Sequence, residues 1–252
     1  MILTTLRSVA PFGKLQIRFW KPSYAISNGQ TITLLFNMHY SRLQYISSGK
    51  TTEEQQQHIV SALDQGVSWI QIRMKNADED SLRRLIHNIV ALKQTYTFTL
   101  IVNDYAHLAL EVGVDGLHLG LTDMPLAEAR ALLGPQKIIG GTANSASDVQ
   151  QRIQEGCDYI GLGPLRHTDS KEKLSPILGL EGYRSIMTHV DASSLPPVFA
   201  IGGIKDSDIK ALRQLGLYGV ALSKHMQDHF ENKQHVKQLN TLLYEHEIDH
   251  RG

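Results

Sequence analysis

Two aspartates, Asp104 and Asp123, each stand just after a short apolar run. The runs, Leu100–Asn103 and Gly116–Gly120, have the composition of buried β-strands. Acids at the exits of successive parallel strands converge on one point. Mg2+ prefers oxygen ligands and is held by one or two carboxylates together with substrate phosphates. The pattern therefore predicts a Mg2+ site, against the alternative in which Asp104 caps a helix and Asp123 opens a turn.

A second polar group follows the apolar run Trp69–Met74. Alternation along a strand places Gln71, Arg73 and Lys75 on one side of it. Cations that point into a barrel mouth are costly unless they meet an anion, and Arg and Lys are the usual phosphate binders. The pattern favours an anion site, although a structural ion pair with a neighbouring strand would use the same residue types.

Later in the chain, two segments carry groups that bind phosphate oxygens. A long polar loop contains Thr168, Ser170 and Lys171, and loops of this length are usually functional or mobile. Gly202 and Gly203 precede a predicted helix, and a Gly-Gly turn lets backbone N–H groups approach a phosphate. The alternatives are a solvated surface loop and a tight strand-to-helix turn.

The elements that must position these residues repeat from residue 43 onward as a short apolar run followed by a segment of helical spacing. Such alternation demands a parallel sheet, since a parallel pair needs a crossover. Eight units predict an α/β fold with a single (β/α)8 TIM barrel; a doubly wound sheet is disfavoured because no G-x-G-x-x-G follows the first run. The runs are Leu43–Ser47, Trp69–Met74, Leu100–Asn103, Gly116–Gly120, Ile138–Thr142, Tyr159–Gly163, Val198–Gly203 and Gly219–Leu222.

The composition limits the kinds of molecule that we expect this protein to bind. Lys and Arg together number 25, as do Asp and Glu, so the formal charge is zero and gives no argument for nucleic acid or a membrane surface. The single cysteine, Cys157, excludes an intrachain disulfide and a cysteine-based zinc cluster. No apolar stretch approaches the ~20 residues of a membrane span. We expect a cytoplasmic protein with small-molecule partners, and a homo-oligomer stays open.

Residues 1–37 differ from the rest, because they are basic and contain no Asp or Glu. A secretory signal is disfavoured because no small-residue cleavage site follows a clean apolar core, whereas an organellar presequence stays open. We expect an N-terminal extension over 1–37, disordered or arising from a misassigned start, and a barrel domain over 38–252.

Taken in order over residues 43–245, the motifs resemble the thiamine phosphate synthase family. The resemblance implies a (β/α)8 transferase that joins hydroxymethylpyrimidine diphosphate to thiazole phosphate, releases pyrophosphate and uses Mg2+. The motifs are Gln71-x-Arg73-x-Lys75, Val102-Asn103-Asp104, residues 115–120 with Asp123, Gly161-Leu162-Gly163-Pro164 with Thr168-x-Ser170-Lys171, and residues 200–204.

The same resemblance implies a role for each matching residue. The metal ligands would be Asp104 and Asp123. The cations acting on the diphosphate and the departing pyrophosphate would be Arg73, Lys75 and Lys171. The remaining substrate-binding residues would be Gln71 and Asn103 on the pyrimidine diphosphate, Thr142 near the diphosphate, and Thr168, Ser170, Gly202 and Gly203 on the thiazole phosphate.

Two positions depart from the family pattern. Where the family has Ser-x-His, this chain has Thr142 and Asn144, which argues against the activity of a related thiazole tautomerase that relies on a histidine there. After the last strand the family has a small hydroxyl residue, so either Ser223 serves with a one-residue shift or Lys224 contributes. The alternatives to a synthase are a tautomerase-like isomerase and a non-catalytic phosphate-ligand binding paralogue.

Overall fold

The computed structural model describes residues 26–27, 30–31, 40–75, 77–167 and 176–245. The chain divides into two compact units, Met1–His39 and Tyr40–Gly252. In the first unit, β1 (Ile26–Ser27) pairs antiparallel with β2 (Gln30–Thr31). Most of the predicted extension lies outside the described residues, so its character stays a prediction.

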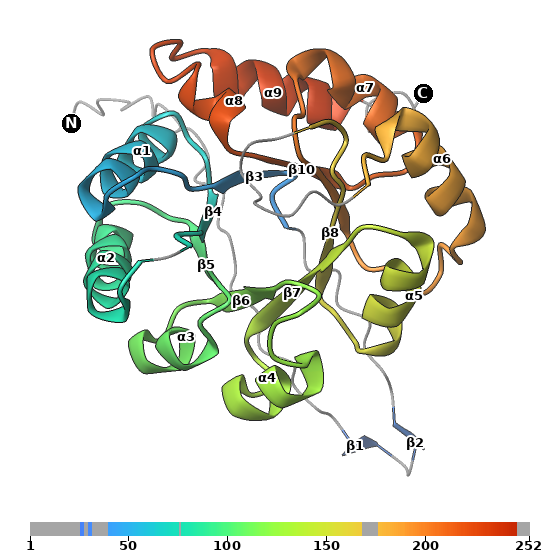
Figure 1. Cartoon of the computed structure of the whole chain (residues 1–252), viewed down its shortest axis with the longest axis horizontal. Coiled ribbons are helices and arrows are strands. Elements are labelled where there is room, and N and C mark those ends of the chain that lie inside the picture. Colours follow the sequence, from blue (N-terminus) through green and yellow to red (C-terminus); the bar gives the residue numbers. More distant parts are fainter. Residues whose placement is uncertain (1–25, 28–29, 32–39, 76, 168–175, 246–252) are drawn as a thin grey trace, which may run out of the picture. The chain divides into compact units, whose positions relative to one another are not determined.

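Eight parallel strands close into a barrel in the second unit (Figure 1). Around the ring the order is β10-β3-β4-β5-β6-β7-β8-β9, so neighbours follow one another in sequence and the last strand pairs with the first. The predicted (β/α)8 barrel is confirmed, and every strand end lies within two residues of its expected position. The strands are β3 (Leu43–Ile46), β4 (Trp69–Ile72), β5 (Thr99–Asn103), β6 (Gly116–Leu119), β7 (Ile138–Ala143), β8 (Tyr159–Leu162), β9 (Val198–Ile201) and β10 (Gly219–Leu222).

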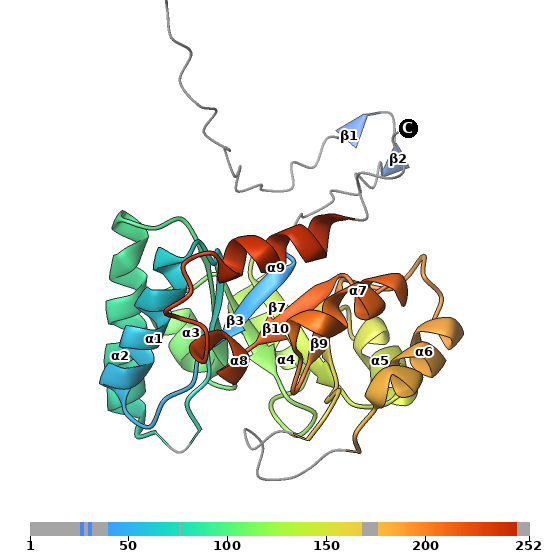
Figure 2. The same cartoon turned by 90° about the horizontal axis from the view of Figure 1, so that it is seen from above.

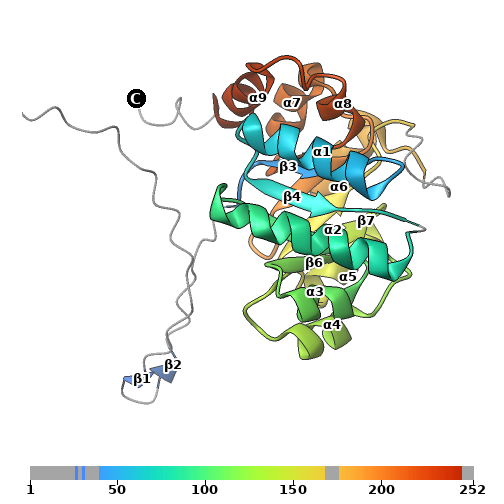
Figure 3. The ribbon, with the colours of Figure 1, turned by 90° about the vertical axis from the view of Figure 1, so that its left-hand side faces the viewer.

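Helices cover the outside of the ring, as Figures 1 and 3 show from two directions. The short α8 follows β10 and was not expected, because four residues are too few to show a helical period. No helix in the described part of the chain is long and apolar enough to cross a bilayer. The helices are α1 (Thr52–Asp64), α2 (Glu79–Ala91) with the 3-10 turn η1 (Leu92–Gln94), α3 (Ala106–Val112), α4 (Leu126–Leu133), α5 (Ala146–Gln154), α6 (Gly179–His189), α7 (Asp206–Gln214), α8 (Lys224–Gln227) and α9 (His235–Tyr244).

Alternation along the strands divides the core into two parts. Outward residues such as Ile70 and Ile72 pack with the helices in one large apolar cluster. Inward residues near the amino ends of the strands form a separate, mainly aromatic cluster of Trp69, Tyr159 and Phe199. The Trp69 ring lies 5.0 Å, centroid to centroid, from each of the other two rings, in the edge-to-face geometry that aromatic pairs favour. This cluster fills the amino end of the barrel, which leaves the opposite end for chemistry.

Space for one of these rings comes from a glycine. A Cβ atom built on Gly140 would lie 2.1 Å from the Cζ atom of Tyr159, whose side chain is fully buried. The ring therefore lies flat across the strand only because residue 140 has no side chain.

We predict that Gly140→Ala destabilises the protein by about 1–3 kcal/mol, since overpacking a filled core costs that much. Urea unfolding followed by circular dichroism measures the change in the free energy of unfolding. Ser147→Ala, at an exposed position on α5, is the matched control and should be nearly neutral. Equal midpoints for the two variants would contradict the packing argument.

Candidate active site at the carboxyl ends of the strands

Toward the carboxyl ends of the strands, two residues past the aromatic cluster, the side chains that point into the barrel are polar. Gln71 on β4, Asn103 on β5, His118 on β6 and Thr142 on β7 are all buried. The His118 ring lies between two hydroxyls, with Nδ1 3.0 Å from the Tyr159 oxygen and Nε2 3.0 Å from Thr142 Oγ1. His118 therefore joins the aromatic layer to the polar layer and orients Thr142.

Asp104 and Asp123 meet at this end of the barrel and form a hydrogen-bonded carboxylate pair. Burial and the hydrogen bond to Asp123 raise the pKa of Asp104 to about 7. Burial also acts to raise the pKa of Asp123, but the hydrogen bond from Asp104 and the Gly120 amide, 2.5 Å away, outweigh it and the pKa falls. Opposite shifts of this kind are typical of two carboxyl groups that share one proton, which a cation would replace.

The backbone at Asp104 has a conformation that few non-glycine residues adopt. Its φ is 68°, in the left-handed region, and it is the one described non-glycine residue with a positive φ. Its amide donates to the His118 carbonyl oxygen on the neighbouring strand, 3.0 Å away. Strained residues of this kind cluster at ligand sites, because the surrounding structure must hold them.

Two cations accompany the carboxylate pair. The charges of Lys75 and Arg73 both act to lower the pKa of Asp104. Burial lowers the pKa of Arg73, and the charges of the two aspartates oppose that effect. β4 ends at Ile72, so the expected alternation stops there, and the exposed Lys75 lies beyond the strand.

Two residues that no sequence pattern marked, Ser47 and Gln55, hold the backbone of Arg73 in place. The Arg73 amide donates to Ser47 Oγ at 3.1 Å, and Gln55 Nε2 on α1 donates to the Arg73 carbonyl oxygen at 3.2 Å. Ser47 Oγ and Gln55 Oε1 are also hydrogen-bonded to each other. The sole signal in the sequence was a glutamine on the buried face of a predicted helix.

Arg152 on α5 is a second positioning residue that the sequence did not reveal. It is buried, and its Nε and Nη2 donate to the carbonyl oxygens of Thr142, at 3.1 Å, and Gly120, at 2.9 Å. Gly120 in turn holds Asp123 through its amide. Arg152 therefore fixes the ends of β6 and β7 around the carboxylate pair.

Gln71 provides a polar atom with no partner. Its Nε2 is buried and makes no hydrogen bond with any described residue. A buried donor without an acceptor is costly, so such an atom in a barrel mouth is suited to a ligand.

A pocket of about 330 Å³ opens at the same end of the barrel. We call it the mouth pocket. Arg73, Gly202, Gly203, Ser223 and Lys224 are among the residues that line it. It therefore brings together the end of β4 and the segments that follow β9 and β10, where phosphate sites occur in such barrels.

The Gly-Gly turn in the mouth pocket needs both glycines. Gly202 and Gly203 have φ values of 83° and 69°. A Cβ atom on Gly202 would lie 2.4 Å from Pro164 Cβ. Arg166 anchors the turn, because its Nη1 lies 3.0 Å from the Gly203 carbonyl oxygen and its guanidinium forms two bonds, 2.5 and 2.6 Å long, with Asp208.

Ser223 and Lys224 both line the mouth pocket but differ in their surroundings. Ser223 precedes α8, is half-buried, and makes no side-chain capping bond. Lys224 is largely exposed, and its Nζ lies 3.1 Å from Asp228 Oδ1. Thr168, Ser170 and Lys171 lie outside the described residues, so their predicted roles stay predictions.

Asn144, at the position of the family histidine, is used in a structural contact. The side-chain Nδ2 of Asn144 donates to the Gly163 carbonyl oxygen. Its backbone N–H donates to Asp148 Oδ2 at 2.8 Å. Asn144 thus ties the end of β7 to the end of β8. The side-chain amide of Asn144 cannot take up and release protons as the imidazole of a histidine does.

Oxygen donors make the carboxylate pair suitable for a hard cation. One or two carboxylates, together with substrate phosphates, are the ligand set that Mg2+ takes in enzymes that bind phosphates. The nearby cations suit the phosphates themselves. Among the described residues, the predicted metal ligands Asp104 and Asp123 therefore lie close to the predicted diphosphate cations Arg73 and Lys75.

Comparison with known proteins identifies a family to which this chain is similar. Residues 43–226 match the family model described as thiamine monophosphate synthase. The chain is 48% identical to a thiamine-phosphate synthase of Flavobacterium johnsoniae over 81% of this chain and 97% of the relative. It is 46% identical to one of Flavobacterium psychrophilum over 81% of this chain and 100% of the relative.

A solved structure agrees with these sequence matches. It is a thiamine phosphate pyrophosphorylase from Pyrococcus furiosus, with a TM-score of 0.68 and 28% identity, covering 81% of this chain and 96% of that one. The family model spans more than half of the chain, and it includes the carboxylate pair and the mouth-pocket residues up to His225. This chain belongs to the thiamine monophosphate synthase family.

Proposed function

We propose that this protein is a thiamine-phosphate synthase, a transferase of thiamine biosynthesis. It condenses hydroxymethylpyrimidine diphosphate with thiazole phosphate and releases pyrophosphate. The observation that carries the proposal is the carboxylate pair, Asp104 and Asp123, with Arg73 and Lys75 beside it. The balanced charge supports small molecules as partners rather than nucleic acid or membranes, and we also propose a cytoplasmic location.

Asp104 and Asp123 would hold Mg2+. The bound ion supplies a Lewis acid that neutralises diphosphate charge. Both carboxylates must be ionised to bind it, and the shared proton of the pair leaves as the ion enters.

The cations beside the pair bind the diphosphate. Arg73, fixed by Ser47 and Gln55, grips phosphate oxygens with its planar fork, and Lys75 adds a point charge. We assign Lys171 to the departing pyrophosphate. Gln71, with its unpaired Nε2, belongs with Asn103 and Thr142 on the pyrimidine side.

The mouth pocket receives the thiazole phosphate. The Gly202-Gly203 turn and the start of α8 present backbone N–H groups, which bind anions because a helix N-terminus carries partial positive charge. Ser223 adds a hydroxyl at the same point. Thr168 and Ser170 are assigned to the same phosphate.

The reaction needs no side-chain nucleophile. The bond between the pyrimidine methylene carbon and the diphosphate oxygen breaks with both electrons leaving on pyrophosphate. The thiazole nitrogen then donates its lone pair to the resulting cation. The chain stabilises the leaving polyanion and places the two substrates against each other, and such placement alone contributes ~7–11 kcal/mol.

A direct assay tests the proposal. Purified full-length protein is mixed with both substrates, and pyrophosphate release is measured with Mg2+ and with excess chelator. We expect release that requires both substrates and the metal. Folded protein that binds thiazole phosphate but releases no pyrophosphate would instead indicate a binding paralogue or an isomerase.

We predict that Asp104→Asn and Asp123→Asn each lower kcat/KM roughly 100-fold or more, because a metal contributes several kcal/mol to such a transition state. Asp80→Asn, at an exposed position on α2, is the matched control. Unchanged melting temperatures would place the loss in the site rather than in the fold. Full activity in either variant would remove that residue from the metal site.

Ser223 and Lys224 can be separated in the same assay. Because Ser223 is at the start of α8 and Lys224 is exposed and paired, Ser223→Ala should raise KM for thiazole phosphate roughly 10-fold, in keeping with the loss of one hydrogen bond to a charged group. Lys224→Met should have a smaller effect on the same KM. The reverse order would assign the phosphate contact to Lys224.

A further inference from the structure

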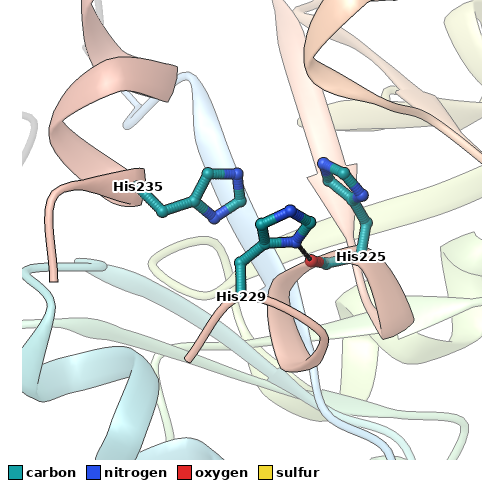
Figure 4. Close-up of side chains that lie close together, drawn as sticks. All are labelled: His225, His229 and His235. Carbon is teal, nitrogen blue, oxygen red and sulfur yellow. Dashed lines mark hydrogen bonds between the residues drawn. The ribbon is translucent and has the colours of Figure 1, made fainter. Parts of the chain in front are cut away.

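Three histidines gather at the edge of the mouth pocket, which one of them, His225, helps to line (Figure 4). His225 is on α8, His229 follows that helix, and His235 begins α9. Each offers a ring nitrogen, and these three atoms lie within 4.8 Å of one another. We call them the histidine cluster. The thiamine synthase chemistry gives it no role.

Hydrogen bonds determine which ring nitrogen of each histidine is free to bind. His229 Nδ1 lies 2.8 Å from the His225 carbonyl oxygen, as Figure 4 shows, and since a carbonyl only accepts, this nitrogen carries the hydrogen. Asp206 Oδ1 on α7 lies 2.6 Å from His225 Nε2 and 3.1 Å from His235 Nε2. The remaining nitrogens, one on each ring, therefore present lone pairs.

The arrangement of partners is typical of metal ligands. Histidines that bind metals donate their second N–H to a carboxylate or a backbone carbonyl, which sets the tautomer and the ring orientation. Asp206 does this for two members of the cluster, and the His225 carbonyl does it for the third.

His235 supplies an independent observation. Only 1% of the residue is exposed, and its Nδ1 is buried with no hydrogen-bond partner among the described residues. A buried polar atom without a partner is costly, and a bound cation would satisfy it.

We propose that His225, His229 and His235 form a site for a borderline divalent transition metal, with Zn2+ as the first choice and Asp206 as the residue that orients two of the ligands. Three neutral imidazoles suit Zn2+ and its neighbours, whereas Mg2+ prefers oxygen ligands. The site is therefore distinct in chemistry from the carboxylate pair.

Spacing along the chain agrees with this assignment. The ligands follow the pattern His-x3-His-x5-His, which is the ligand spacing of a zinc-binding motif in metalloproteases. Met226 stands where that motif has its catalytic glutamate, so the cluster has the ligands without that general base. The role that follows is structural rather than hydrolytic.

Binding requires the cluster to close and a ring to turn, because the rings of His229 and His235 are stacked, with centroids 4.3 Å apart and an interplanar angle of 25°. Two nitrogens bound to one zinc at 2.0–2.1 Å lie roughly 3.3 Å apart, which is closer than the 4.8 Å limit within which these atoms fall. His225 and His229 are half-buried, and the second side-chain torsion of histidine is broad, so ring rotation can supply the movement.

The location explains what the metal would do. α7, α8 and α9 lie side by side in Figures 1 and 3, and Figure 2 shows the same group from above. Asp206 begins α7 directly after the Gly-Gly turn, and His225 itself lines the mouth pocket. A metal here would pin the helix starts that border the mouth pocket, and so stabilise the fold.

The test uses full-length protein with any histidine tag removed, stripped with chelator and titrated calorimetrically with Zn2+ in excess Mg2+. We expect one Zn2+ per chain and a higher melting temperature on binding. The Asp104→Asn/Asp123→Asn double variant should bind Zn2+ equally well. This separates the site from the carboxylate pair, and a failure of the proposed synthase activity would leave the result unaffected.

His229→Ala should lower Zn2+ affinity at least 100-fold and abolish the rise in melting temperature. Asp206→Ala should lower the affinity 10–100-fold, as is usual for loss of an orienting residue. His87→Ala, at an exposed position on α2, is the matched control and should bind as the parent does. If His235→Ala fails to fold, His229→Ala still decides the question. No Zn2+ binding by the parent, or equal binding by His229→Ala, would overturn the proposal.

Discussion

The contact on which this barrel's chemistry depends is the pairing of Asp104 with Asp123. Two carboxyl groups in partial burial repel each other when both are ionised, so they coexist only by sharing a proton or a cation. The backbone around the two carboxyl groups accommodates this pairing. The left-handed backbone at Asp104 aims one group, and the Gly120 amide stabilises the charge of the other.

Buried polar networks then hold the ends of the strands around the pair. Arg152 joins the ends of β6 and β7 by two carbonyl contacts, while Ser47 and Gln55 fix the backbone of Arg73 at the end of β4. Each network satisfies backbone groups that a strand leaves unpaired where it ends. The same bonds that stabilise the fold therefore place the groups that bind substrate.

The proposed phosphate site in the mouth pocket is built mainly on backbone. The Gly202-Gly203 turn fits closely under Pro164, and Arg166 with Asp208 fastens it to α7. The histidine cluster lies at the edge of this region and links α7 to α8 and α9 through Asp206. A pocket whose walls are already fixed would bind the proposed phosphate without first having to order them.

The sequence by itself determined the barrel, its eight strands and the identity of the acids, because strand burial and the strand-helix period are local properties of the chain. It also placed Asp104 and Asp123 at strand exits, from which their meeting follows. Tertiary structure alone decided which residues hold the site. Arg152, Gln55 and Arg166 read as ordinary helix and loop residues, and α8 is too short to show a period. The histidine cluster is likewise a feature that only the tertiary structure decided. His225 and His235 become neighbours of Asp206 only when α7 packs against α8 and α9, and packing between distant segments leaves no local trace in a single sequence.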